Sequence, residues 1–279
     1  MLNIYGTIGY TLLQSSEGNN IIVLADMHDK LPKCNNKTNI AKWLKSKFKT
    51  SEILLEEVPR HFKLKELWPD SEHTQELKNL YLENTKVIDP VDIRPSLVPF
   101  SWEVLTDVKK MPSFEFQLYN IQLSKYLDSI NSFFCLNNKK MCETLKIYSP
   151  SKLKETKLGS HYLKLKKKYF NYLTKNSKYL NEQLVDIIIM DSDVLEKINN
   201  ILNSIMEWYI CAKIYMKKER PIILNTGLYH SDNVIKWLTR HYNYKVIKNQ
   251  GINTIEESEQ SDNKMKGCIN IDMTTDSIF

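Results

Sequence analysis

The chain has 279 residues, of which 42% are hydrophobic and 26% are charged, and its net charge is +6. This composition predicts a globular protein with enough apolar material for a sizeable core. No apolar run approaches the roughly 18 residues of a membrane-spanning helix, and the N-terminus lacks the basic and apolar regions of a signal peptide. We therefore expect a soluble, intracellular, cytoplasmic protein.

The chain contains five cysteines, and no two of them form a CxxC pair. They are Cys34, Cys135, Cys142, Cys211 and Cys268. An odd number of scattered cysteines predicts reduced, mostly structural thiols in an intracellular protein.

The N-terminal part of the chain alternates strand and helix patterns. Asn3–Gln14 and Ile21–Asp26 are rich in β-branched and aromatic residues, and they flank the turn-rich "SSEGNN", which predicts a β-hairpin. Apolar residues at helical spacing follow over Ile40–Phe48. The stretch "SEILLEE" after them is typical of a short buried strand.

A further helix and strand are predicted before residue 100. Leu64–Leu82 has the pattern of one or two amphipathic helices broken near Pro69, and "KVIDPVDIRP" is typical of a third strand that Pro95 ends. Because helical patterns separate these short apolar strands, the order predicts βαβ units and a mainly parallel sheet.

Residues 100–216 interrupt the alternation and are predicted to form a helical insertion. Apolar periodicity predicts helices over Phe114–Leu136 and Asp193–Met216, and Asp193 with Glu196 has the spacing of a capping box. Between these helices, Ser151–Tyr179 mixes lysines with tyrosines and leucines.

The sheet pattern resumes near Pro221. "PIILNTG" is typical of a buried strand, and the helix after it is expected to be capped by Ser231 or Asp232 and to extend through Leu238. "YKVIKNQ" predicts a further strand. From Ile252 the chain is polar and acidic, which predicts a flexible tail.

The expected architecture is a mixed α/β fold with a mainly parallel sheet flanked by helices, an N-terminal β-hairpin and a large helical insertion. The expected parts are 1–99 as the first half of the α/β core, 100–216 as the insertion, 217–251 as the second half of the core and 252–279 as the acidic flexible tail.

Four predicted strands pass from apolar to polar residues at their carboxyl ends, in "IIVLADMHD", "ILLEEVPR", "VIDPVDIRP" and "PIILNTGLYH". Ligands bind outside the carboxyl ends of strands in open α/β sheets. If the strands are neighbours, one rim collects Asp26, His28, Glu56, Glu57, Asp92, Arg94, Asn225, Tyr229 and His230. Such a set suits general acid–base work or metal-assisted hydrolysis.

Each of these residues also has an ordinary structural interpretation. His28 alone is typical of a turn, Glu56 and Glu57 of a solvated strand end, and Asp92 and Arg94 of a simple ion pair. These separate interpretations do not predict that all four strands end in the same way, and the shared rim favours a functional site.

The segments "ADMHD", "LLEEVPR", "VDIRP" and "GLYHSDNVIKWL" occur in this order along the chain. Together they resemble the superfamily of TraB, ChaN, TIKI-type and erythromycin-esterase-like proteins, with the first segment closest to the E-x-H-D form of the ChaN group. The resemblance covers about residues 1–95 and 220–250. Ala25 stands where the family usually has glycine, and Asp26 stands where it often has glutamate.

The resemblance implies a hydrolase that cleaves an amide or ester in a small molecule or peptide. His28 and His230 would be the central imidazoles, and Glu56 would hold a metal or activate water. Arg94 would hold an anionic oxygen, and Asp26 would orient a histidine or complete a ligand set. The supporting residues would be Asp26, Asp29, Glu57, Asp92 and Tyr229, with Glu57 turned to the other face by strand alternation.

Two mechanisms stay open at this point. Two imidazoles and a carboxylate (His28, Glu56 and His230) with one open position are a common set for a catalytic divalent ion such as Mn, Co or Zn. Without a metal, an imidazole near its ordinary pKa of about 6.5 is itself a competent base.

Two other classes of function also stay open. Twelve lysines against two acids between Lys139 and Lys178 suit nucleic acid or an anionic membrane, although this segment has no arginine and no recognised nucleic-acid motif, so such binding is not favoured. Alternatively, the departure at Ala25 and Asp26 is compatible with a catalytically inactive scaffold or interaction protein. His61 and His73, which flank a helical stretch, are expected at the surface.

Overall fold

A computed structural model describes most of the chain. The described residues are 2–32, 34, 37–58, 71–94, 122–125, 128, 157–175, 177–183, 186, 192–217, 219–260 and 267–271. Two compact units are present, one made of Met1–Asp92 with Tyr209–Phe279 and the other of Ile93–Trp208. The predicted helix over Phe114–Leu136 lies almost wholly outside the described residues.

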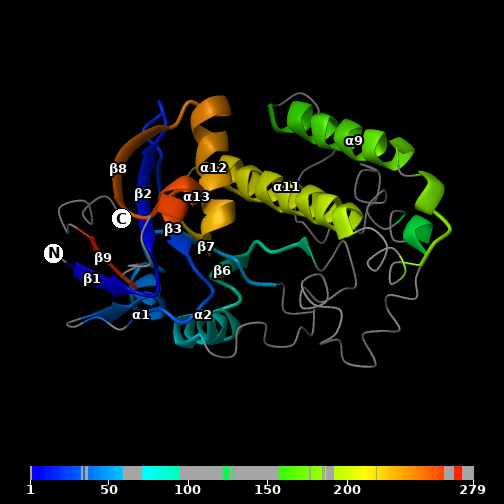
Figure 1. Cartoon of the computed structure of the whole chain (residues 1–279). Coiled ribbons are helices and arrows are strands. Elements are labelled where there is room, and N and C mark those ends of the chain that lie inside the picture. The colour runs from blue at the N-terminus through cyan, green and yellow to red at the C-terminus, as the bar shows by residue number, and fades with distance from the viewer. Residues whose placement is uncertain are drawn as a thin grey trace. The chain divides into compact units, whose positions relative to one another are not determined.

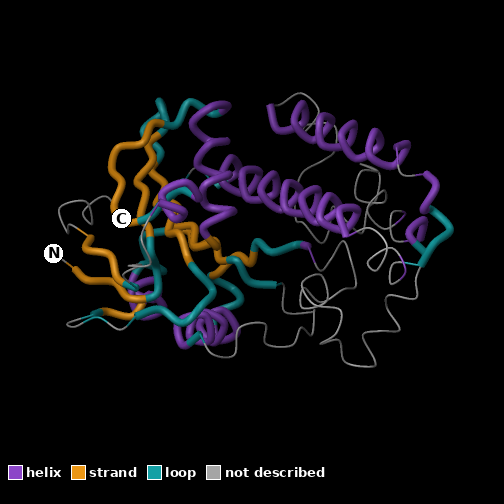
Figure 2. Tube along the Cα trace, in the orientation of Figure 1, coloured by secondary structure: helices purple, strands orange, loops and turns teal. Residues whose placement is uncertain are grey.

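Strands and helices alternate through the first unit (Figures 1 and 2). In chain order they are β1 (Leu2–Tyr5), β2 (Gly9–Gln14), β3 (Asn20–Asp26), β4 (Thr38–Asn39), α1 (Ile40–Ser46), β5 (Glu52–Leu55), α2 (Glu72–Glu83), β6 (Ile88–Pro90), β7 (Ile222–Gly227), α12 (Leu228–His241), β8 (Lys245–Gly251), α13 (Ile255–Gln260) and β9 (Cys268–Ile271). The second unit contains α9 (Lys157–Lys175) and the short 3-10 helix η2 (Ser177–Tyr179), and α11 (Ser192–Met216) runs from this unit into the first.

The main sheet has six strands in the order β6-β5-β7-β3-β2-β8. Neighbours among β6, β5, β7 and β3 run parallel, whereas β2 is antiparallel to both β3 and β8. The prediction of a mixed, mainly parallel α/β sheet with an N-terminal hairpin is therefore confirmed. The central strands β3 and β7 are buried along almost their whole length, as parallel strands covered on both faces must be.

Helices cover the sheet on both faces (Figure 1). On one face, Trp43 and Leu44 of α1 and Leu77 of α2 belong to the same buried cluster as Leu24 and Ile223 of the central strands. On the other face α12 lies against β3 and β7. Among the described residues, no helix is both long and apolar enough to cross a bilayer.

The single strand predicted over Asn3–Gln14 is wrong, because the structure divides it at Gly6. Gly6 has φ of 99°, and an added Cβ would lie 2.6 Å from Ile40 Cγ2, so only glycine fits this bend. Strand β1, which precedes the bend, lies outside the main sheet and pairs with β4 and β9 in a second sheet.

The segment predicted to be a flexible tail contains α13 and β9. Strand β9 pairs antiparallel with β1, and Ile269 and Ile271 at alternate positions are buried. Cys268 in this strand forms a disulfide with Cys34, so the prediction of reduced thiols is wrong for this pair, whereas Cys211 is free and buried. The short period-two pattern of "CINI" was hidden by the polar residues around it.

Helix α12 begins three residues before the predicted capping residues. Its N-cap is Gly227, so Ser231 and Asp232 lie inside the helix and are buried. The Asp232 carboxylate accepts hydrogen bonds from Lys236 Nζ (2.7 Å) and from the backbone N–H of Ile255 (3.3 Å) at the start of α13. The carboxylate therefore contacts both its own helix, through Lys236, and the first residue of α13.

Candidate active site

The carboxyl ends of β3, β5 and β7 meet at one edge of the main sheet. In the parallel register Asp26 of β3 stands opposite Gly227 of β7, and Leu55 of β5 stands opposite Asn225. The backbone N–H of Glu56 donates to Asn225 O at 3.0 Å, which continues the ladder one residue past β5. The predicted rim residues of these three strands therefore lie side by side.

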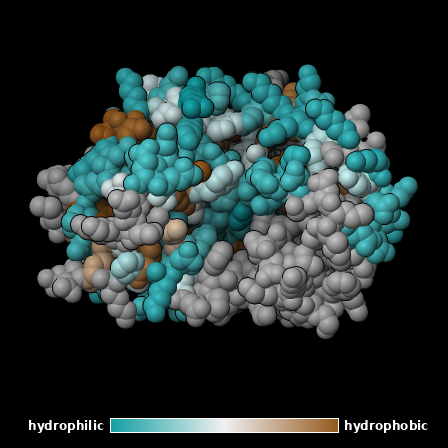
Figure 3. All heavy atoms as spheres, viewed as in Figure 1, coloured by the Kyte–Doolittle hydropathy of each residue, from teal (hydrophilic) through white to brown (hydrophobic). Residues whose placement is uncertain are grey.

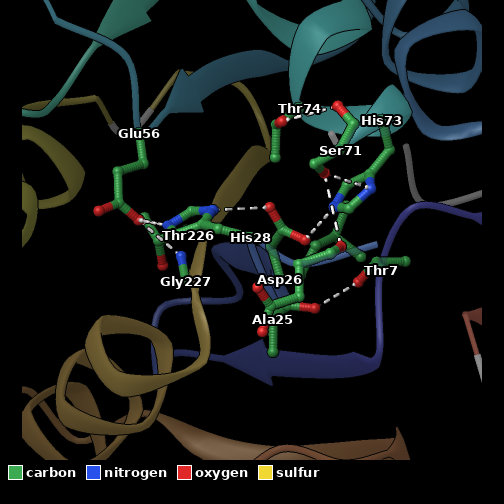
Figure 4. A network of polar contacts seen from close by, with 12 residues as sticks. Thr7, Ala25, Asp26, His28, Glu56, Ser71, His73, Thr74, Thr226 and Gly227 are labelled. Carbon is green, nitrogen blue, oxygen red and sulfur yellow. Dashed lines mark hydrogen bonds and ion pairs between the residues drawn. The ribbon is translucent and has the colours of Figure 1, made fainter. Parts of the chain in front are cut away.

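Asp26 is a buried carboxylate held between two imidazoles (Figure 4). One oxygen lies 2.7 Å from His73 Nε2, and the other lies 3.3 Å from His28 Nδ1. Burial alone would raise the pKa of Asp26, but its contacts with His28 and His73 outweigh burial and lower the pKa to about 2. Asp26 is therefore ionised at neutral pH, where it accepts a hydrogen bond from His73 Nε2 and forms a longer ion-pair contact with His28 Nδ1.

His73 is fully buried, so its predicted surface position is wrong. Its Nδ1 lies 3.1 Å from Ser71 Oγ, so both ring nitrogens have polar partners. His73 precedes Leu77 and Leu80 by four and seven residues on α2, and both leucines are buried. This helical spacing on an apolar face was the available signal for the burial of His73.

His28 lies at the open side of Asp26, with 29% of its side chain exposed. Its Nε2 is 3.8 Å from Glu56 Oε2, and Glu56 Oε1 is 3.7 Å from His230 Nε2. Glu56 Oε2 accepts the backbone N–H of Gly227 at 2.6 Å, which fixes the carboxylate between the two rings. The series His73–Asp26–His28–Glu56–His230 thus alternates imidazoles with carboxylates.

Gly227 allows these groups to lie close to the backbone of β7. A Cβ at this position would lie 3.1 Å from His28 Nε2 and 3.4 Å from Glu56 Oε2. A side chain here would require the imidazole to shift by a few tenths of an ångström. The glycine in "NTGLYH" therefore serves the site as well as the start of α12.

The side chain of Glu57 has a different environment from that of its neighbour Glu56. Burial is the main cause that raises its pKa to about 7, and the charges of Asp92 and Glu56 add to this while Lys78 of α2 opposes it. Asp92 is itself buried, and its backbone N–H donates to Glu57 O at 3.2 Å. Glu57 is therefore a carboxyl group that titrates near neutral pH beside the site.

The other predicted residues are placed differently. Asp29 is exposed. Tyr229 is 44% exposed, and its ring forms a T-shaped contact with that of His230 at 5.4 Å between centroids. Arg94 belongs to the second unit, where its guanidinium donates to Asn203 Oδ1 at 3.0 Å. Its role as the group that holds an anionic oxygen stays a prediction.

A metal ion held by His28, Glu56 and His230 stays a prediction. Within the described part of the chain, no three His, Cys, Asp or Glu side chains form a group suited to a metal. His28 Nδ1 is directed at Asp26, and one oxygen of Glu56 accepts the N–H of Gly227. The arrangement of alternating imidazoles and carboxylates suits proton transfer.

Comparisons of the chain with family models, curated proteins and solved structures gave no match.

Proposed function

We propose that this protein is a hydrolase that cleaves an amide or ester with a water molecule activated by His28. The observation that carries the proposal is the contact between buried Asp26 and His28 Nδ1 at 3.3 Å. An ionised carboxylate on Nδ1 selects the tautomer with the proton on that nitrogen, which leaves Nε2 unprotonated and able to act as a base.

The reaction follows from the position of Nε2. His28 Nε2 takes a proton from water as the oxygen of that water bonds to the carbonyl carbon of the substrate, and the π electrons of the carbonyl move onto its oxygen. When this C=O bond forms again, the C–O or C–N bond to the leaving group breaks, and the imidazolium gives its proton to the leaving oxygen or nitrogen. The products are an alcohol or amine and a carboxylic acid, which loses its remaining proton to solvent at neutral pH, and His28 is neutral again.

Glu56 and His230 support this step from the far side of His28. The separations of 3.7 and 3.8 Å around the Glu56 carboxylate exceed ordinary hydrogen bonds but are short enough to tighten when a substrate binds. Glu56 would hold the water and balance the positive charge that develops on His28, and His230 would donate to the substrate.

The test is a panel of small esters and peptides with purified protein and with the variants His28→Ala, Glu56→Gln and His230→Ala. His241→Ala, which changes an exposed histidine at the end of α12, is the matched control. We expect His28→Ala to lower turnover by on the order of 10³-fold and His241→Ala to leave it unchanged. Parallel assays with a chelator and with Mn²⁺, Co²⁺ or Zn²⁺ measure any dependence on a metal.

Equal turnover in wild type and His28→Ala would remove His28 from the mechanism. If no substrate of the panel is turned over by the wild type, the alternative of a catalytically inactive scaffold is favoured instead.

A further inference from the structure

Helix α9 (Lys157–Lys175) has one face that is fixed inside the second unit. Leu158, Tyr162, Leu165 and Tyr169 are buried at the spacing of one helical stripe. Trp208 of α11 packs on this stripe, because its ring lies 5.3 Å from that of Tyr162 and its Nε1 donates to Leu158 O at 3.0 Å. The opposite face of α9 therefore has a defined orientation.

All the charged side chains of α9 are positive. The helix contains six lysines and no aspartate or glutamate. Lys164, Lys167, Lys168 and Lys175 are all exposed. In Figure 3, hydrophilic residues predominate on the described surface at the upper right, where Figure 1 draws α9. A face of this kind attracts a polyanion and repels cations.

Two large apolar side chains lie beside these lysines. Leu163 is 51% exposed and Phe170 is 39% exposed, and their separation of seven positions places both on the same side of the helix, two turns apart. Lys166 Nζ lies 5.6 Å from the centre of the Phe170 ring. Water solvates the lysines well and the apolar pair poorly, so the face matches a partner that is both anionic and apolar.

We propose that α9 docks on an anionic lipid bilayer. The exposed lysines meet the negative headgroups, while Leu163 and Phe170 enter the boundary between headgroups and acyl chains. A nucleic acid matches the lysines equally well, but it offers no apolar layer for a leucine, which cannot stack on bases as an aromatic ring does. The docking surface belongs to the second unit and does not depend on the proposed hydrolysis.

The experiment measures flotation of the full chain with vesicles of phosphatidylcholine alone or with about 30 mol% phosphatidylserine. We expect binding only to the vesicles with phosphatidylserine, and weaker binding as salt is raised. The variant Lys164→Glu/Lys167→Glu/Lys168→Glu should lower the partition coefficient by on the order of 100-fold, since each lysine near an anionic surface contributes about fivefold.

A matched control makes the same charge change elsewhere. Lys42→Glu/Lys45→Glu/Lys49→Glu alters three exposed lysines in and just after α1, and we expect it to keep most of the binding. Leu163→Ser/Phe170→Ser, which keeps every charge, should weaken binding by on the order of tenfold. Circular dichroism of each variant verifies that its helices are intact.

Three results would overturn the proposal. The first is no binding that depends on phosphatidylserine. The second is an equal loss in the two triple-lysine variants, which would mean that only net charge matters. The third is binding to single-stranded RNA that competes with vesicles and is unchanged in Leu163→Ser/Phe170→Ser, which would assign the surface to nucleic acid.

Discussion

Two sets of acidic side chains in the first unit differ in the cations that face them. Near the start of β5, Glu52 contacts Lys217 at 2.7 Å and also pairs with Arg220, and Lys217 contacts Asp89 at 3.0 Å. Burial raises the pKa of Glu52, but hydrogen bonds from Lys217 and Arg220 outweigh it and lower the pKa. Because lysine and arginine stay charged at neutral pH, these pairs have one protonation state and serve the architecture.

At the carboxyl ends of β3 and β5, the carboxylates face imidazoles instead. Asp26 lies between His28 and His73, and Glu56 lies between His28 and His230. An imidazole can gain and lose a proton near neutral pH, so these contacts can change protonation state during a reaction. The difference teaches that the partner of a carboxylate, more than the carboxylate itself, separates a structural pair from a candidate catalytic one.

The sharpest test of this comparison changes one carboxylate at each end. Asp26→Asn should lower hydrolysis by on the order of 10³-fold, because an amide has one acceptor and cannot receive N–H bonds from both His28 and His73. Glu52→Gln should leave hydrolysis unchanged. Initial rates on a substrate from the ester and peptide panel provide the measurement. An equal loss of hydrolysis in Asp26→Asn and Glu52→Gln would contradict the distinction between carboxylates that face imidazoles and carboxylates that face lysine or arginine.

A second test concerns stability at the same end. His73→Ala should lower the free energy of unfolding by about 3 kcal/mol, because it leaves a cavity and removes a donor from the buried, ionised Asp26. His73→Gln can still donate to Asp26 and should recover part of the loss. Urea denaturation of the three proteins measures both effects. A loss below about 0.5 kcal/mol in His73→Ala would mean that Asp26 does not depend on this imidazole.

The third test uses pH. Since the pKa of Glu57 is about 7 in the fold and near 4.5 in the unfolded chain, the folded state binds this proton more tightly. Its contribution to stability is full below about pH 4.5 and is lost as pH rises through 7. Glu57→Gln should therefore be more stable than wild type by about 2 kcal/mol at pH 8 and similar to it near pH 5. Unfolding curves at both pH values measure this difference. The same difference in stability between Glu57→Gln and wild type at pH 5 and pH 8 would contradict the raised pKa of Glu57.

The sheet could be predicted from the sequence because its strands carry strong local signals. The runs ending at Asp26, Leu55 and Gly227 are apolar and bounded by turn or polar residues, and each forms a strand close to its predicted place. The rule that parallel strands share a carboxyl edge then brings Glu56 and His230 near His28. This much follows from period and topology alone.

The rest depends on tertiary contacts that no local pattern contains. The position of His73 beside a helical stretch predicts a surface residue, whereas its burial depends on polar partners, above all on Asp26, which lies 47 residues away. The pairing of β9 with β1 joins the two ends of the chain, which periodicity cannot predict. A four-residue strand inside a polar segment is too short to stand out from its surroundings.

The smallest expected effect lies at the structural end of the comparison. Lys217→Met removes the ammonium that contacts Glu52 and Asp89 but keeps most of the side-chain volume. The side chain is 26% exposed and Arg220 still pairs with Glu52, so the free energy of unfolding should fall by only about 0.5 to 1 kcal/mol. Hydrolysis should not change, and added salt should shrink the difference from wild type. Urea denaturation at two salt concentrations measures this. If Lys217→Met lowers the free energy of unfolding as much as His73→Ala does, the lysine ion pairs stabilise the fold as strongly as the carboxylate–imidazole contact. Imidazole partners would then distinguish a candidate catalytic carboxylate from a structural one, but they would not indicate a larger contribution to stability.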